Sequence, residues 1–155
     1  MGGNDISDLE SLRSLNQLIV LMLFDNQISD LSLLGELINL QERSPGNNQS
    51  CQTASLQPLR NLEELLLFNN QVSDGRPLQS LPRFIWLALY NNAVTAATLL
   101  SMLLLRRLDL RGVPFDEDIC PVEPASFCLF SDPMAQSTPN ALEMFEGVMS
   151  QLPDV

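Results

Sequence analysis

The sequence predicts an α/β repeat fold: a right-handed solenoid whose units each add one strand to a parallel concave sheet and return through a short 3-10 or irregular convex segment. Three observations support this prediction. The chain repeats itself every 22 residues, leucines recur at fixed positions in each repeat, and an asparagine follows the leucines. No single repeat can bury its leucines alone, so neighbouring repeats must stack into a continuous core. With 155 residues, the chain is long enough for one such domain.

The repeat is visible where DNQISDLSLL, from residue 25, echoes GNDISDLESL, from residue 3. At this offset residues 1–114 divide into about five units, of which the last is one residue short. The units are 6–27, 28–49, 50–71, 72–93 and 94–114.

Within the units the pattern L-x-x-L-x-L-x-x-N recurs. Its clearest examples are Leu18, Leu21, Leu23 and Asn26; Leu62, Leu65, Leu67 and Asn70; and Phe84, Leu87, Leu89 and Asn92. The pattern is that of leucine-rich repeats, and the unit opening with ISDL resembles the internalin-type repeats of bacterial proteins. The resemblance covers about residues 1–114 and implies a non-catalytic solenoid that binds other proteins.

An asparagine ladder is expected where each strand ends, because the side-chain amide can both donate to and accept from backbone groups of the bend. Its members are Asn4, Asn26, Asn48, Asn70 and Asn92. The second unit departs from the pattern, since Arg43 and Pro45 occupy positions where leucines should point inward. An unpaired buried guanidinium is costly and proline cannot donate to a β-ladder, so this strand is expected to be distorted, bulged or lost.

The composition narrows the classes of function. The net charge is −11, all eight basic residues are arginine, and there is no histidine. Because basic side chains are few, nucleic acid and anionic membrane surfaces are disfavoured as partners. No apolar run approaches the roughly 20 residues that cross a bilayer. Without histidine the commonest general base and a frequent metal ligand are missing. We therefore expect no enzymatic activity, no cofactor and no metal.

Side chains that alternate with the leucines should point into the concave groove, which explains the position of Leu66 and Phe68 in LEELLLFNN. Aromatic residues there either stabilise one another across strands or form an exposed interaction surface, and we favour the second interpretation. The residues expected to contact a partner are Phe24, Glu64, Leu66, Phe68, Trp86, Tyr90, Arg107 and Arg111. If Phe68 is exposed, Phe68→Asp should abolish binding without unfolding the chain.

Three hypotheses about function follow. The leading one is a non-catalytic protein–protein interaction module that binds another protein or a peptide through the concave aromatic face. The alternative is a structural subunit or fragment of a larger assembly, which makes contacts or self-associates through an uncapped N-terminal end. A remote alternative is a carboxylate-based metal-binding or hydrolase site at Glu42 and Glu64.

Residues 115–155 break the repeat and are predicted to form an acidic C-terminal capping segment with a helix at about 138–152. Cys120 and Cys128 form either a disulfide that staples this cap or two packed, reduced thiols. Both interpretations stay open, because the compartment is unknown. No signal peptide is visible, which favours the cytoplasm for the chain as written, but an exported mature form would look the same and the localisation stays open.

Overall fold

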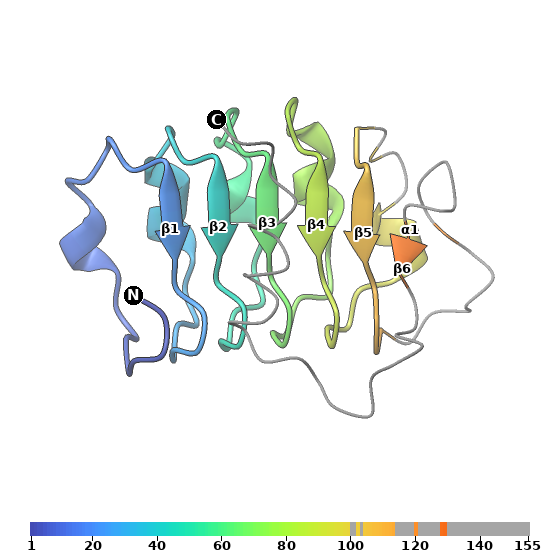
Figure 1. Ribbon diagram of the computed structural model, residues 1–155, viewed down its shortest axis with the longest axis horizontal. Helices are drawn as coiled ribbons and strands as arrows, with labels where there is room; N and C mark the ends of the chain where they lie inside the picture. The colour runs from blue at the N-terminus through green and yellow to red at the C-terminus, as the bar shows by residue number, and fades with distance from the viewer. Residues whose placement is uncertain (100–101, 103, 114–119, 121–127, 130–155) are drawn as a thin grey trace, which may run out of the picture.

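The computed structural model describes residues 1–99, 102, 104–113, 120 and 128–129. The described strands form one parallel sheet in chain order, from β1 to β6, and the sheet is open rather than closed (Figure 1). The strands are β1 (Val20–Met22), β2 (Glu42–Ser44), β3 (Glu64–Leu66), β4 (Trp86–Ala88), β5 (Arg107–Asp109) and β6 (Cys128–Leu129). The predicted right-handed leucine-rich-repeat solenoid is thereby confirmed.

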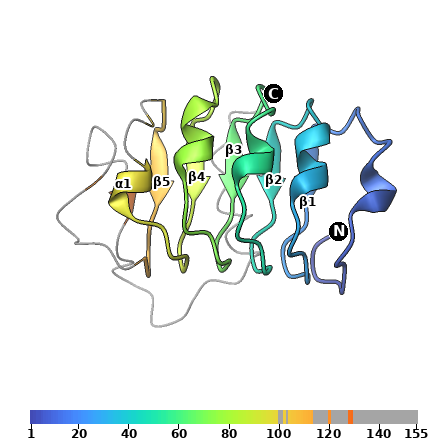
Figure 2. The same ribbon diagram turned by 180° about the vertical axis from the view of Figure 1, so that it is seen from behind.

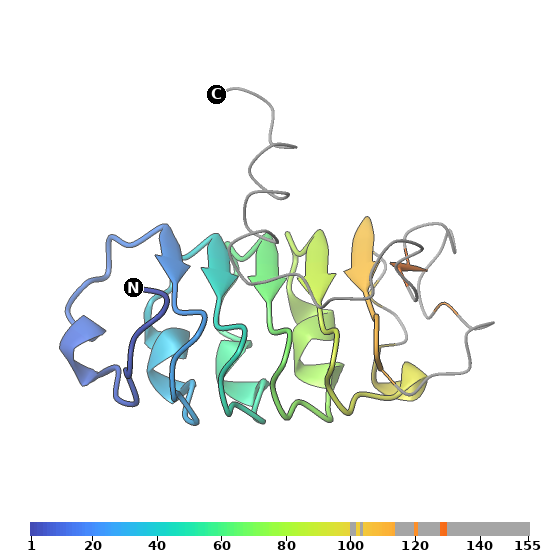
Figure 3. The same cartoon turned by 60° about the horizontal axis from the view of Figure 1, so that its bottom comes forward.

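Short helical turns line the convex side, in front of the sheet in Figure 2 and below it in Figure 3. They are the 3-10 helices η1 (Glu10–Leu12), η2 (Ser32–Glu36), η3 (Ala54–Leu56) and η4 (Arg76–Ser80), and the α-helix α1 (Ala96–Leu99). Aspartate carboxylates start three of the turns: Oδ1 of Asp8, Asp30 and Asp74 accepts from the backbone N–H two residues later, at 2.7, 2.8 and 2.9 Å. These local bonds satisfy donors that a short helix leaves unpaired.

The hydrophobic core lies between the sheet and the turns. The register places Leu21 beside Arg43, Arg43 beside Leu65, and Leu65 beside Leu87. Because side chains alternate along a strand, these central residues point inward and their two neighbours point to the concave face. The repeat length thus decides which side chains line that face.

The asparagines Asn26, Asn48, Asn70 and Asn92 are buried where the chain leaves each strand. In one unit, Nδ2 of Asn70 donates to the carbonyl oxygens of Pro45, Leu67 and Phe68 at 2.9, 3.0 and 3.1 Å. Its Oδ1 accepts from the N–H of Ser50 at 2.9 Å. Each such amide therefore joins its own unit to the preceding one.

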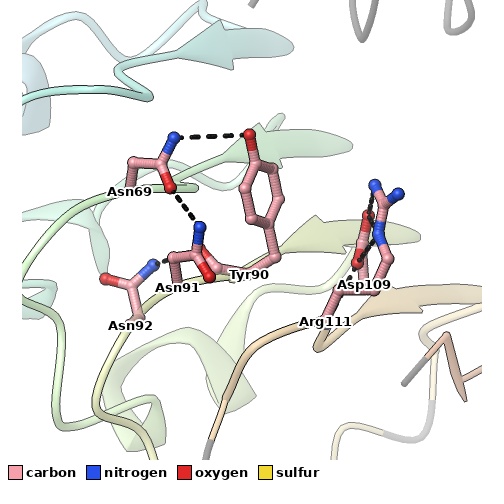
Figure 4. Close-up of polar contacts among 6 residues, drawn as sticks. All are labelled: Asn69, Tyr90, Asn91, Asn92, Asp109 and Arg111. Carbon is pink, nitrogen blue, oxygen red and sulfur yellow. Dashed lines mark hydrogen bonds and ion pairs between the residues drawn. The ribbon is translucent and has the colours of Figure 1, made fainter. Parts of the chain in front are cut away.

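A second ladder, which sequence reasoning missed, runs one residue before the first. Asp25, Asn47, Asn69 and Asn91 have φ between 50 and 55°, a left-handed conformation that asparagine and aspartate tolerate better than other non-glycine residues. Their side chains are hydrogen-bonded in series, and Nδ2 of Asn91 donates to Oδ1 of Asn69 at 2.7 Å (Figure 4). The doublets DN at 25–26 and NN at 47–48, 69–70 and 91–92 were the available signal.

The expectation that the second strand is distorted or lost is wrong. β2 is a regular strand with three register pairs to β1. Arg43 enters the core and is 1 % exposed, and its Nη2 donates to the carbonyl oxygens of Leu34 and Leu37 at 2.9 and 3.4 Å. The cost of Pro45 is local, because β2 has only two register pairs with β3.

Replacing Asn70 by alanine is expected to lower the free energy of unfolding by about 2–4 kcal/mol, because it leaves buried backbone groups without partners. Asn69→Ala should cost about 1–2 kcal/mol, because alanine is strained at positive φ. Denaturant unfolding, followed by far-ultraviolet circular dichroism, measures both changes.

Glycine is the matched control at both positions. Asn69→Gly should be close to the wild type, since glycine adopts positive φ freely, whereas Asn70→Gly should be at least as unstable as Asn70→Ala. Equal losses for Asn69→Gly and Asn69→Ala would contradict the conformational explanation.

At the C-terminal end of the described residues, β6 pairs with β5, and Cys120 and Cys128 form a disulfide. The predicted helix at about 138–152 lies outside the described residues. Within the described part of the chain, no helix is long and apolar enough to cross a membrane.

Candidate functional site

The concave face carries a second apolar cluster, separate from the main core. It consists of Leu66, Phe68, Trp86, Ala88 and Tyr90, with Phe24 packed against it. We call this set the concave cluster. Its five buried members come from β3, β4 and the residues that follow those strands, so the parallel register brings them together, and Phe24 follows β1.

The rings of the concave cluster are held by close stacking. The Phe68 and Tyr90 rings are 5.1 Å apart between centroids and 4° from parallel. Phe68 also lies over Gly46, where an added Cβ would be 2.4 Å from the ring. Phe24 lies over Gly2 in the same way, so glycine in this column provides the space that each ring occupies.

The expectation that the aromatic stripe is exposed is wrong for its central members. Phe68 is 0 % exposed, Tyr90 3 % and Trp86 8 %, and Leu66 is also buried. Large rings on neighbouring strands, about 4.8 Å apart, cover one another. Phe24 is partly exposed, and Val20 at the end of the sheet is 45 % exposed.

Two arginines lie over the aromatic rings at the C-terminal end of the face. The guanidinium carbon of Arg107 is 4.4 Å from the Trp86 ring centroid, and that of Arg111 is 5.4 Å from the Tyr90 centroid. Both geometries fit cation–π contacts. Arg111 also pairs with the buried Asp109 through Nε–Oδ1 at 2.9 Å and Nη2–Oδ2 at 2.7 Å (Figure 4).

Tyr90 has a polar contact as well, because Nδ2 of Asn69 donates to its hydroxyl at 3.3 Å (Figure 4). Burial raises the pKa of this phenol. Trp86 is different: its buried indole N–H donates to no acceptor among the described residues. An unpaired buried donor is unusual. A hydrogen-bond acceptor placed near the indole N–H of Trp86 would therefore be favoured.

On the central strands of the face, β2 and β3, the charge is negative. Glu42 and Glu64 are register neighbours on β2 and β3, and we call them the acidic pair. Burial raises the pKa of Glu64 to about 7, with further contributions from Glu42 and Glu63 and an opposing one from Arg107. Burial and Glu63 raise the pKa of Glu42. Among the described residues, no three acidic or cysteine side chains gather in a way that would hold a metal ion.

Neither a protein-family model nor a curated protein matches the sequence, whereas solved structures do. An internalin, inlF, from Listeria monocytogenes aligns with a TM-score of 0.76 and 27% identity over 83% of this chain. Internalin C2 from the same organism aligns with a TM-score of 0.76 and 28% identity over 84%. The chain has the leucine-rich-repeat fold and is similar to these internalins. A Leptospira interrogans leucine-rich-repeat protein shares the fold, with a TM-score of 0.65 and 24% identity over 83% of the chain.

This leucine-rich-repeat solenoid corresponds to only part of those proteins. The alignments span 39% of inlF, 58% of internalin C2 and 35% of the Leptospira protein. The likeness therefore concerns the repeat architecture, and the partners of the chain have to be inferred from its own side chains.

Sequence reasoning placed its eight candidate residues on one side of the leucine-rich-repeat solenoid, and the register puts the strand residues among them there: Glu64, Leu66, Trp86 and Arg107. The expected ion pair between Asp109 and Arg111 on the last strand is present. Sequence reasoning missed Gly46 as the space for Phe68. The signal was a small residue between Phe24 and Phe68 in the repeat register.

Proposed function

We propose that this chain is a non-catalytic interaction module that binds another protein or a peptide through its concave face. The observation that carries the proposal is an aromatic cluster on the sheet face opposite the core, with carboxylates beside it on β2 and β3 and arginines at its C-terminal end. Aromatic and arginine side chains are the usual energetic centres of protein interfaces.

The buried and half-buried members of this face have different roles in the proposal. Phe24, Glu64, Arg107 and Arg111 keep part of their surface exposed and are the contacts that a partner reaches first. The buried rings hold these side chains in place, as the Arg107–Trp86 contact shows. Contacts that are ordered before binding lose less conformational entropy when the partner arrives.

A peptide library displayed on phage and selected on the purified chain tests the proposal. Enriched peptides, labelled and titrated by fluorescence anisotropy, should lose about tenfold or more in affinity with Phe24→Ala or Arg107→Ala. The exposed Arg83, outside the concave face, provides the matched control Arg83→Ala. Peptides that bind all three variants equally would show that the concave face is not the binding surface.

The N-terminal end offers a second candidate function, in assembly. β1 stands at one end of the strand order, and Leu15, Ile19 and Val20 beside it are 42, 51 and 45 % exposed. An unpaired strand edge next to exposed apolar side chains favours association. Sedimentation velocity of the wild type and of Val20→Glu tests this, because a dimer through this end should dissociate in the variant.

A further inference from the structure

The acidic pair lies in the middle of the concave face. In parallel strands, register neighbours are about 4.8 Å apart, so the carboxylates of Glu42 and Glu64 project side by side. Both residues are only partly exposed. Glu63, the residue before Glu64 in the chain, adds a third negative charge. This charge raises the pKa of both Glu42 and Glu64.

Arginine side chains neutralise these negative charges only weakly. The ion pairs of Arg13, Arg76 and Arg111 engage other carboxylates. From β5, Arg107 favours the ionised form of Glu64, yet its influence is the smallest of those that act on this group. β4 places no charge beside Glu64, because its register neighbour there is Trp86. A half-buried carboxylate surrounded in this way binds a proton more readily than one in water.

We propose that Glu64 is a proton switch in the concave face: one proton, taken up in mildly acidic solution, neutralises the carboxylate beside Trp86 and changes what the face can bind. That protonation controls binding rests on the proposed function. The protonation of Glu64 itself can be measured on the chain without a partner. With Glu64 ionised, the middle of the face repels acidic groups and attracts basic ones. With Glu64 neutral, the charge beside Trp86 is lost, and the middle of the face repels acidic groups less.

The linkage to stability has a definite sign. The folded-state pKa of Glu64, about 7, lies above the ordinary glutamate value of 4.5. The folded chain therefore binds more protons than the unfolded chain between these values, and the free energy of unfolding falls as pH rises through this window. Most carboxylates that are paired in the folded state produce the opposite slope.

Trp86 makes the experiment direct, because it is the sole tryptophan of the chain and Glu64 is its register neighbour. Its fluorescence, recorded from pH 4.5 to 8.5, should show a transition with a midpoint near pH 7. With no histidine in the chain, few other groups titrate there. The transition should vanish in Glu64→Gln and persist in the matched control Glu36→Gln, which removes an exposed carboxylate on the convex side.

A second variant keeps the test decisive if Glu64→Gln does not fold. Glu42→Gln removes the nearest like charge from β2, so the midpoint should move to lower pH while the amplitude remains. The switch would be disproved by a wild type without a transition above pH 5.5, or by a transition that survives in Glu64→Gln. Neither result bears on peptide selection at a single pH, so failure of the switch and failure of the proposed function remain distinguishable.

Discussion

Phe68→Asp is expected to unfold the solenoid rather than to impair binding alone. The side chain is 0 % exposed, lies over Gly46 and is stacked on Tyr90. Losing a buried phenyl ring costs about 3–5 kcal/mol, and a buried carboxylate without a partner adds to this. The sum approaches the 5–15 kcal/mol that typically separates folded from unfolded domains. Thermal melting followed by circular dichroism should show a transition that is lost or lowered by tens of degrees.

Phe24→Asp is the matched control, because Phe24 occupies the same column one strand before Gly46 and is partly exposed. Its substitution should lower the melting temperature much less and leave the fold intact. A Phe68→Asp chain that melts like the Phe24→Asp chain would show that Phe68 is accessible in solution. The original expectation of a binding defect without unfolding would then be restored.

Arg43→Leu is expected to stabilise the chain by about 1–4 kcal/mol, the range found when buried charged groups are replaced by apolar ones of similar size. Arg43 is 1 % exposed, and its Nε and Nη1 donate to no acceptor among the described residues. Burial also lowers its pKa to about 9, so at neutral pH a charged guanidinium is held in the core. Denaturant unfolding should show a higher midpoint with an unchanged slope.

The hydrogen bonds that Arg43 makes do not reverse this expectation. The carbonyl oxygens of Leu34 and Leu37 also accept from the backbone N–H groups of Leu37 and Leu40, at 3.2 and 3.1 Å. Both therefore keep a partner when the guanidinium is removed. Leucine suits the position, since the register neighbours on both sides, Leu21 and Leu65, are leucines.

Two further variants serve as controls for Arg43→Leu. Arg43→Met replaces the long aliphatic stem with an apolar chain of closer volume and should stabilise at least as well if Arg43→Leu leaves a cavity. The exposed Arg83→Leu should change stability by less than about 0.5 kcal/mol. If both Arg43 variants were less stable than the wild type, the bonds to η2 would have to be the main anchor of the second unit.

The concave face connects these predictions to function. Its aromatic rings are a structural layer as well as the centre of the proposed interface, so variants that probe binding must be chosen from the half-buried residues. Phe24 and Arg107 meet this requirement, and Phe68 does not. The acidic pair adds a titratable element to the same surface, so a search for partners should be made on both sides of pH 7.

The sequence by itself determined the repeat, the strand positions and the face on which each strand residue lies. These follow from local regularities, namely a period of 22 residues and the alternation of side chains along a strand. The tertiary structure alone decided three other matters: the burial of Phe68, the carbonyl partners of Arg43 and the desolvation of Glu64. Each depends on packing against atoms that other segments of the chain bring close. A repeat pattern predicts the face of the sheet from which a side chain projects, but the residues packed around that side chain determine whether water reaches it.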